Sequence, residues 1–212
     1  MSDWKTITAS APAKVILHGE HSVVYGKLAL AASLDLRTKV TIKNNNNNTI
    51  LNHHVKQQHQ RRNLRVHFLS YAKTPIDIDL EVIRSLSYDL GTTCIDEILK
   101  TKLVQLVCDC CPEEHLVHSE GLVAFLYLMV ALFQESGLII PAAIEVTVNS
   151  DIPIGAGLGS SAAFSVASAA ALIQLLLGLQ RRPKCDLKTV QDRICQWSFK
   201  SEKIIHGTPS GK

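Results

Sequence analysis

The sequence predicts an α+β fold in which helices pack on one face of a mixed sheet. The first observation is an order of elements in which strand-like segments dominate the first third and long apolar helical segments dominate the rest. The second is the segment Ala143–Asn149, where Ile144, Val146 and Val148 alternate with polar residues as in a half-buried strand. An apolar helical segment follows it directly after a glycine-rich loop.

The elements follow from local patterns in chain order. Strands are expected near residues 4–9, 13–18, 28–43, 64–70 and 143–150, with a break in the third left open. Helices are expected near residues 76–88, 93–107, 115–136, 160–178 and 187–204. The helix from residue 160 is rich in Ala and Leu and should end at Gly178. Apolar residues at helical spacing predict the last helix, with Asp186 as its N-cap.

The loop before the fourth of these helices reads Pro-Ile-Gly-Ala-Gly-Leu-Gly-Ser-Ser-Ala-Ala over residues 153–163. Alternate glycines let a backbone turn tightly and bring its N–H groups close to an anion. Ser160 and Ser161 fall at the helix start, where free N–H groups and the helix dipole favour negative charge. The spacing matches neither G-x-x-x-x-G-K-[ST] nor G-x-G-x-x-G. Alone, it is equally compatible with an ordinary glycine turn that has a serine N-cap.

Two other segments contain candidate site residues. Lys14 begins the strand core Val15–Leu17, and His18, Glu20 and His21 follow it, a set that suits a polar substrate site or a solvated strand end. Glu202 lies near the end of the last helix, before the turn His-Gly-Thr-Pro-Ser-Gly of residues 206–211. On these residues alone a solvated position remains the simpler interpretation of each segment.

Taken together, the segments resemble the GHMP family of small-molecule kinases. Ala-Pro-Ala-Lys-Val-Ile-Leu-His-Gly-Glu-His-Ser-Val-Val, from residue 11, resembles the N-terminal signature of its mevalonate kinase branch. The glycine loop resembles the family's ATP loop, and residues 121–128 and 205–211 also resemble mevalonate kinases. The resemblance implies an N-terminal ATP-binding domain over residues 1–212 with a left-handed β-α-β unit around the loop.

The resemblance also implies an activity, transfer of the ATP γ-phosphoryl group to the 5-hydroxyl of mevalonate in isoprenoid and sterol precursor synthesis. Lys14 would be catalytic, Glu20 and His21 would line the substrate side, and Ser161 and Glu202 would hold Mg²⁺. The residues expected to contact ATP are Lys14, Ser150, Gly155, Ala156, Gly157, Leu158, Gly159, Ser160 and Ser161. Phosphoryl transfer rests on positioning and charge neutralisation, which a metal ion and a lysine supply.

The sequence departs from the family at its end. The family's catalytic Asp follows the Pro-Ser-Gly turn by two residues, and here the sequence stops at Lys212, one residue after that turn. The second half of the family fold, a ferredoxin-like C-terminal domain, is also absent. We therefore expect an inactive fragment of a mevalonate kinase. The alternatives are another GHMP kinase, such as a phosphomevalonate kinase, and a non-catalytic ATP-binding remnant.

The stretch from residue 43 to 63 is rich in Asn, His and Gln and predicts a flexible, solvated insert. Its histidines lack helical register and nearby carboxylates, which makes a metal site there a poor interpretation.

Composition limits the remaining function classes. A hydrophobic fraction of 46% supports a real core, and a net charge of +3 is too small to argue for nucleic acid. Six cysteines without a signal peptide predict reduced thiols in the cytoplasm, and the C-x-x-C spacing at Cys108 has no second pair to complete a zinc site. Residues 162–179 are apolar enough to span a membrane, but we expect a buried core helix. By resemblance the full-length enzyme would be a homodimer that does not bind membranes.

Overall fold

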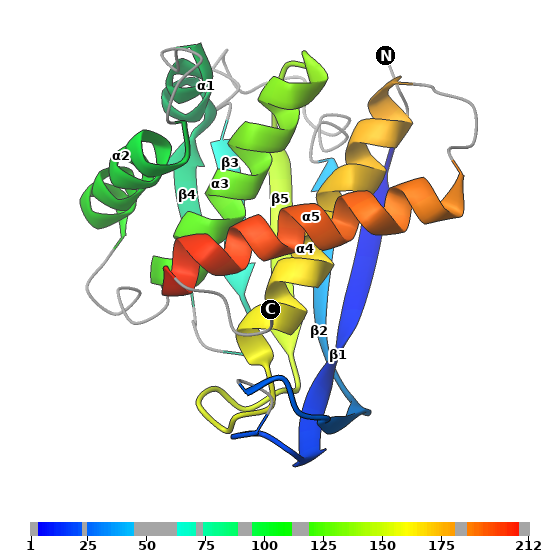
Figure 1. The fold of residues 1–212 in the computed structure, drawn as a ribbon. Coiled ribbons are helices and arrows are strands. Elements are labelled where there is room, and N and C mark those ends of the chain that lie inside the picture. The colour runs from blue at the N-terminus through cyan, green and yellow to red at the C-terminus, as the bar shows by residue number, and fades with distance from the viewer. Residues whose placement is uncertain are drawn as a thin grey trace, which may run out of the picture.

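The computed structural model describes residues 4–22, 25–44, 63–70, 74–88, 95–111, 119–180 and 186–207. Within them lie five strands and five helices (Figure 1). The strands are β1 Thr6–His18, β2 Leu30–Asn44, β3 Asn63–Phe68, β4 Ile76–Asp79 and β5 Ile144–Ser150. The helices are α1 Leu80–Tyr88, α2 Ile95–Cys110, α3 Ser119–Ser136, α4 Ser160–Gln180 and α5 Leu187–His206.

The five strands form one mixed sheet in the order β1-β2-β5-β3-β4. β5 is the central strand, antiparallel to β2 and parallel to β3, although it is the last strand in the sequence. Its C-terminal end leads directly into the glycine loop and α4, so the loop lies at one end of the sheet's middle strand. The sheet thus fixes where the loop begins.

The first two predicted strands are one strand in the structure. β1 continues through Pro12, and its register against β2 shifts between Pro12 and Ala13, where Asp35 and Leu36 of β2 are the extra residues. A proline cannot donate a ladder hydrogen bond, and β1 is an edge strand of this sheet, where proline is tolerated. The anticipated break in residues 28–43 is therefore a local irregularity within a continuous β2.

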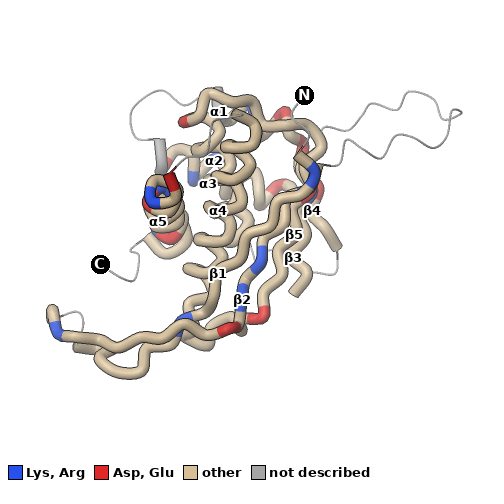
Figure 2. Tube along the Cα trace, turned by 90° about the vertical axis from the view of Figure 1, so that its right-hand side faces the viewer, with Lys and Arg blue, Asp and Glu red and all other residues tan. Residues whose placement is uncertain are grey.

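All helices lie on the same side of the sheet, as the view of Figure 2 shows. The inward residues of β2, β3 and β5 are buried apolar side chains, whereas Lys39, Arg65 and Glu145 lie on the other face. On that polar face Arg65 forms a two-pronged ion pair with Asp77 of β4, at 2.8 and 2.9 Å, which raises the pKa of Arg65. The predicted α+β fold with helices on one face is confirmed.

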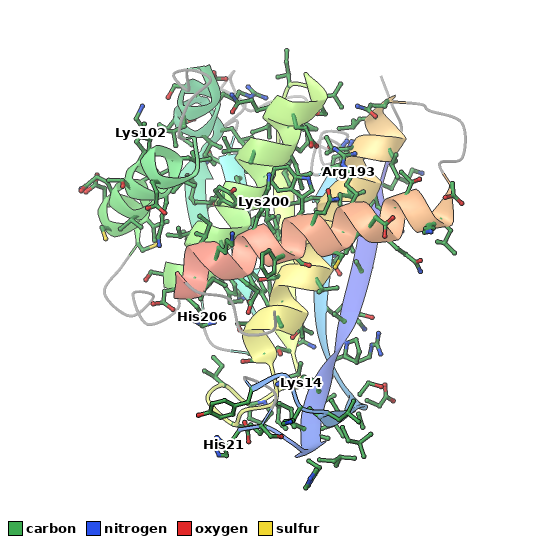
Figure 3. All side chains as sticks on the ribbon, in the orientation of Figure 1. Lys14, His21, Lys102, Arg193, Lys200 and His206 are labelled. Carbon is green, nitrogen blue, oxygen red and sulfur yellow. The ribbon has the colours of Figure 1, made fainter. Side chains whose placement is uncertain are left out.

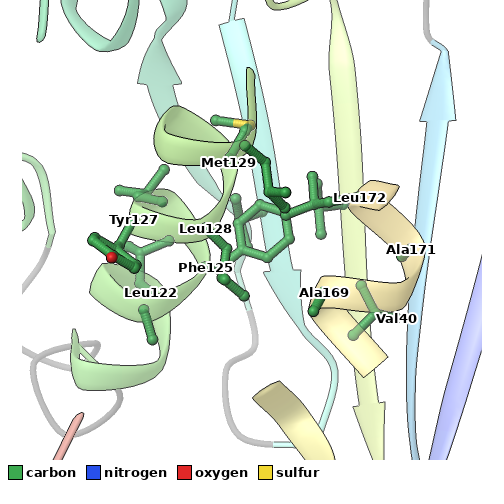
Figure 4. Packing of buried hydrophobic residues seen from close by; sticks show 14 of the residues in the cluster. Val40, Leu122, Phe125, Tyr127, Leu128, Met129, Ala169, Ala171 and Leu172 are labelled. Atoms are coloured by element: carbon green, nitrogen blue, oxygen red, sulfur yellow. The ribbon is translucent and has the colours of Figure 1, made fainter. Parts of the chain in front are cut away.

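The core lies between the sheet, α3 and α4 (Figure 4). Every residue of α3 from Leu122 to Phe133 is buried, because sheet, α2, α4 and α5 surround that helix. α4 packs on β1 and β2, and its small residues Ala169 and Ala171 are fully buried. α5 then crosses over α3 and α4 as an outer layer (Figure 1).

The predicted helix 76–88 is wrong in its first turn. Ile76–Asp79 is the strand β4, with Ile76 and Ile78 buried and Asp77 and Asp79 exposed. This Ile-Asp-Ile-Asp alternation is itself a strand pattern, and β3 supplies the hydrogen-bonding partner. The Asp79 carboxylate then accepts a hydrogen bond from the Glu81 N–H at 2.8 Å, which marks the start of α1.

The other helix ends differ by a few residues from the predicted ones. α4 continues through Gly178 to Gln180, because Leu177 and Leu179 on either side of the glycine pack against the core and offset its weak helix propensity. α5 begins after Asp186, whose side chain accepts from the Thr189 N–H as predicted for its N-cap. α2 and α3 begin at residues 95 and 119 and end at 110 and 136.

The predicted flexible insert lies largely outside the described residues. Residues 45–62 are among those not described, and Lys43, Asn44 and Asn63 belong to β2 and β3. In the described part of the chain α4 is the one helix long and apolar enough to cross a membrane. Most of its apolar window is buried against the sheet and α3, as in the core helix of a globular domain.

Candidate functional site

The glycine loop presents its backbone to solvent at the start of α4. Gly155, Gly157 and Gly159 all have positive φ, at 75°, 71° and 72°. Within the described residues no acceptor bonds the backbone N–H groups of residues 154–159. The Ala163 N–H donates to the Gly159 carbonyl at 3.0 Å, so glycine is the N-cap and Ser160 is already helical. The serine N-cap interpretation is therefore wrong.

Lys14 of β1 lies against this loop. Its backbone N–H donates to the Leu158 carbonyl at 3.0 Å, which ties the edge strand to the loop. A Cβ built on Gly159 would stand 3.1 Å from Cγ and 3.4 Å from Cε of Lys14. The lysine stem therefore passes directly over Gly159, and Figure 3 places the side chain beside the first turn of α4.

Glu202 of α5 faces the first two turns of α4. It is 8% exposed, and its two carboxylate oxygens accept from two serine hydroxyls one helical turn apart. Ser161 donates to Oε2 at 3.4 Å and Ser165 contacts Oε1 at 3.2 Å. Ser165 also bonds Ser201 at 3.0 Å within the same helix interface. The predicted pair Ser161 and Glu202 is thus in direct contact.

Glu202 has no cationic partner in the part of the chain that the structure describes. No lysine or arginine there lies within ion-pair distance of it. Moving a carboxylate out of water costs roughly several kcal/mol, unless an opposite charge or several hydrogen bonds offset this cost. Two hydroxyls offset part of that cost, at about 1.5–3 kcal/mol for each bond to a charged group. A bound cation would offset the rest, and hydroxyl and carboxylate oxygens are ligands that Mg²⁺ prefers.

His206 completes the contacts of Ser161. Its Nε2 atom lies 3.1 Å from the Ser161 hydroxyl oxygen. Glu202 and His206 are four residues apart on α5, and Ser161 and Ser165 are four apart on α4, so each pair shares one face of its helix. Figure 3 shows His206 at the last turn of α5.

Ser150 is fixed where β5 enters the loop. Its hydroxyl lies 2.8 Å from that of Thr38 and accepts from the Ile152 N–H at 3.3 Å. Ser70, just beyond β3, accepts from the Ser150 N–H at 2.9 Å and donates to its carbonyl at 3.0 Å. These bonds hold the entrance of the loop on three strands.

Glu20 and His21 have no hydrogen bond to this cluster within the described residues. Both are in the exposed turn after β1, and Figure 3 shows His21 at the same end of the molecule as Lys14. Neither side chain has a hydrogen bond or ion pair within the described residues. The structure therefore brings together Lys14, the loop, Ser161 and Glu202, but it does not bring Glu20 and His21 into contact with them.

Other candidate features lie away from the loop. A cavity of about 270 Å³ opens at the C-terminal end of α3, where Arg84, Phe133 and Ile140 are among its lining residues. The cavity is lined mainly by residues that come just before β5 in the sequence, whereas the glycine loop comes just after β5. The cavity and the loop therefore lie at opposite ends of that strand. At the end of α2, burial and the neighbouring charge of Asp109 raise the pKa of Cys110, and burial and adjacent thiols raise that of Cys111. The described residues hold no group of three or more metal-ligating side chains.

Three contacts around Glu202 and Ser161 were not predicted from the sequence. Ser165 lies one turn after Ser161, and that i, i+4 spacing is the signal that would have found it. Ser201 and the contact of His206 with Ser161 have no such signal, because they depend on how α5 crosses α4.

Comparison with known proteins gives a family for the chain. Residues 124–212 match the model described as the GHMP kinases N terminal domain. A mevalonate kinase of Arabidopsis thaliana is 34% identical over 210 residues, which cover 97% of this chain and 53% of that protein. The Homo sapiens mevalonate kinase is 34% identical over 98% of this chain and 50% of its own length. The chain therefore spans about half the length of the curated relatives it matches.

Solved structures show the same fold. The Methanococcus jannaschii mevalonate kinase superposes with a TM-score of 0.61 at 20% identity, over 98% of this chain and 49% of that one. A Lactococcus lactis galactokinase complexed with galactose gives 0.54 at 16% identity, over 97% of this chain and 39% of that one. Residues 124–212 therefore match the N-terminal domain of the GHMP kinases, and the whole chain is similar in sequence to the first half of mevalonate kinases and shares their fold.

Proposed function

We propose that this chain supplies the nucleotide-binding half of a mevalonate kinase, which transfers the γ-phosphoryl group of MgATP to the 5-hydroxyl of mevalonate. The observation that carries the proposal is the buried Glu202 carboxylate, hydrogen-bonded to Ser161 at the start of the helix that the glycine loop opens. An acid buried without a cationic partner among the described residues, beside a loop of free N–H groups, suits a metal–phosphate complex.

The loop and α4 bind the phosphates in this proposal. The N–H groups of residues 154–159 and the positive end of the α4 dipole attract the phosphate oxygens. Ser150 holds the loop entrance in place through the bonds to Thr38 and Ser70. The chain's own contribution is thus a rigid, anion-binding turn on the middle strand of the sheet.

Ser161 and Glu202 would hold Mg²⁺, with hydroxyl and carboxylate oxygens as ligands. When bound, the ion neutralises charge on the phosphate oxygens. Lys14, whose stem lies against Gly159, would stabilise negative charge that develops at the transferred group. Glu20 and His21, in the exposed turn after β1, would contact mevalonate.

Nucleotide binding by residues 1–212 tests the metal assignment. Calorimetry would compare ATP with MgATP for the unaltered chain and for Glu202→Gln, with Glu97→Gln as a control because Glu97 is an exposed carboxylate on α2. We expect Mg²⁺ to strengthen binding in the unaltered chain and in the control. Glu202→Gln should lower the ratio of MgATP affinity to ATP affinity by at least about tenfold. An equal magnesium effect in all three proteins would refute the assignment.

The substrate assignment needs the second half of the fold. A fusion of residues 1–212 to the second half of the Arabidopsis thaliana relative should phosphorylate mevalonate. Phosphomevalonate offered in its place tests the alternative kinase, and a preference for it would overturn the proposed substrate.

A further inference from the structure

The hydrogen bonds around Ser161 show how the hydrogen and the lone pairs of its hydroxyl group are used. A serine hydroxyl has one hydrogen to donate and two lone pairs to accept with. The hydrogen is directed to Glu202 Oε2, at 3.4 Å. With the hydrogen used in that bond, the ring N–H is the donor in the contact of 3.1 Å between His206 Nε2 and Ser161, which requires the Nε2–H tautomer of His206. One lone pair of Ser161 remains, next to the glycine loop.

We propose that His206 is a positioning residue that fixes the Ser161 hydroxyl, so that its remaining lone pair is directed at the cation of the nucleotide. The inference rests on the proposed metal–nucleotide site and assigns a role there to a residue beyond its ligands. Without the ring, the hydroxyl can rotate about its Cα–Cβ bond, and only its bond to Glu202 restrains it. A donor on the opposite side fixes the rotamer.

The end of α5 is built to hold the ring in place. Ile204 is buried at 6% exposure and anchors the last turn in the core. The Gly207 N–H donates to the Lys203 carbonyl at 2.8 Å and closes the helix directly after His206. His206 itself stays exposed at the edge of the interface, so it contributes little to the core. Its substitution should therefore alter the site more than the stability of the fold.

The tautomer of the ring gives a test that is independent of any ligand. Long-range ¹H–¹⁵N NMR correlations at pH 8 report which nitrogen of a neutral histidine carries the proton. The His206 signal is assigned by its loss in His206→Gln. We expect the Nε2–H form, because that nitrogen donates to Ser161. A ring protonated at Nδ1 alone would overturn the proposal.

Metal-dependent binding gives the second test. The ratio of MgATP to metal-free ATP affinity is measured for residues 1–212 carrying His206→Phe, His206→Gln or Ser161→Ala. We expect His206→Phe to reduce the magnesium effect by about ten- to a hundredfold, as for other groups that orient metal ligands. His206→Gln, which keeps an amide N–H at a similar reach, should retain most of it. Gln196→Ala, exposed on the same helix, is the matched control and should change nothing.

The outcomes separate the two proposals. If Ser161→Ala keeps the full magnesium effect, the proposed metal site itself is wrong. If Ser161→Ala loses the effect and His206→Phe keeps it, the metal site stands and the role of His206 is refuted. Urea unfolding of each variant verifies that it is folded, and Gln and Phe variants of equal stability but different magnesium effects support the positioning role.

Discussion

At Gly159 a side chain would be in tight contact with Lys14. A methyl group there meets the lysine stem at 3.1 Å, whereas at Gly155 nothing lies within 4 Å of the same position. The two glycines have nearly equal φ, 72° and 75°. Alanine at either position should therefore cause the same backbone strain, but only at Gly159 would it also contact Lys14.

Substitution of each glycine by alanine should separate strain from displacement. Both variants should lose about 1–2 kcal/mol of unfolding free energy, the cost of a left-handed conformation for a residue with a Cβ. Gly159→Ala should in addition push Lys14 aside and weaken ATP binding more than Gly155→Ala does. Urea unfolding and calorimetric ATP titration measure the two effects. Equal ATP affinities would show that the position of Lys14 does not matter for binding.

The thiols at the end of α2 should react slowly near neutral pH. Burial, followed by the charge of Asp109, raises the pKa of Cys110, and burial, followed by the adjacent thiols, raises that of Cys111. Only the thiolate is nucleophilic, so labelling by iodoacetamide should rise about tenfold per pH unit below each pKa. Peptide mass spectrometry between pH 7 and 9 resolves the two residues. Labelling of Cys111 that is complete within minutes at pH 7 would contradict the expectation.

At the scale of elements, α4 carries a line of serines along the side that α5 covers. Ser165 and Ser168 are both fully buried and three residues apart. Ser165 bonds Glu202 and Ser201, whereas the Ser168 hydroxyl has no hydrogen-bond partner in the described part of the chain. The same substitution should therefore have opposite effects at the two positions.

Ser165→Ala should cost about 1–3 kcal/mol, because it leaves a buried carboxylate oxygen and the Ser201 hydroxyl without a partner. Ser168→Ala should be neutral or stabilise the protein by about 1 kcal/mol, because it removes an unsatisfied polar group. Helix propensity changes equally in both variants. Denaturant unfolding followed by circular dichroism gives the comparison, and a larger loss at Ser168 would mean that its hydroxyl does have a partner.

The packing of α3 should outweigh its surface ion pair. Phe125 is fully buried between the sheet and α4, whereas Arg193 of α5 pairs with Glu135 of α3 near the surface. Phe125→Ala should cost about 3–5 kcal/mol and Arg193→Met less than about 1 kcal/mol. The midpoints of thermal unfolding measure both. A larger loss for Arg193→Met would contradict the view that the apolar burial of α3 stabilises the fold more than its surface ion pair does.

At the scale of the whole molecule, the sequence predicted most of the elements and the closeness of Ser161 to Glu202. Local patterns sufficed for β5, the loop and α4, because alternation, glycine spacing and apolar helix composition are all read within a few residues. The strand β4 was missed because four alternating residues directly before a helix were taken as its first turn. The contact of His206 with Ser161 lay beyond sequence reasoning, since it depends on the angle at which two distant helices cross. The position of β5 between β2 and β3 likewise has no local signal.

Residues 1–212 alone should not phosphorylate mevalonate at a useful rate. Within these residues no acid follows the Pro-Ser-Gly turn to accept the hydroxyl proton, and general base assistance is typically worth about 10²–10⁴-fold. A coupled ADP-release assay would compare them with the fusion described above. If residues 1–212 turned over mevalonate at a rate near that of the fusion, the prediction that they need a further base and a second half would be wrong.

The place of β5 in the sheet has a consequence for how the chain folds. β1 with β2 and β3 with β4 can pair as soon as each is made, but only β5 joins the two pairs, and it comes some hundred residues after β2. Contacts of such long sequence separation form late and slow the folding of a domain. A nascent chain therefore carries two separate hairpin-like pieces, each with an unpaired strand edge, until residue 150 has left the ribosome. During that interval these edges are open to association with other chains.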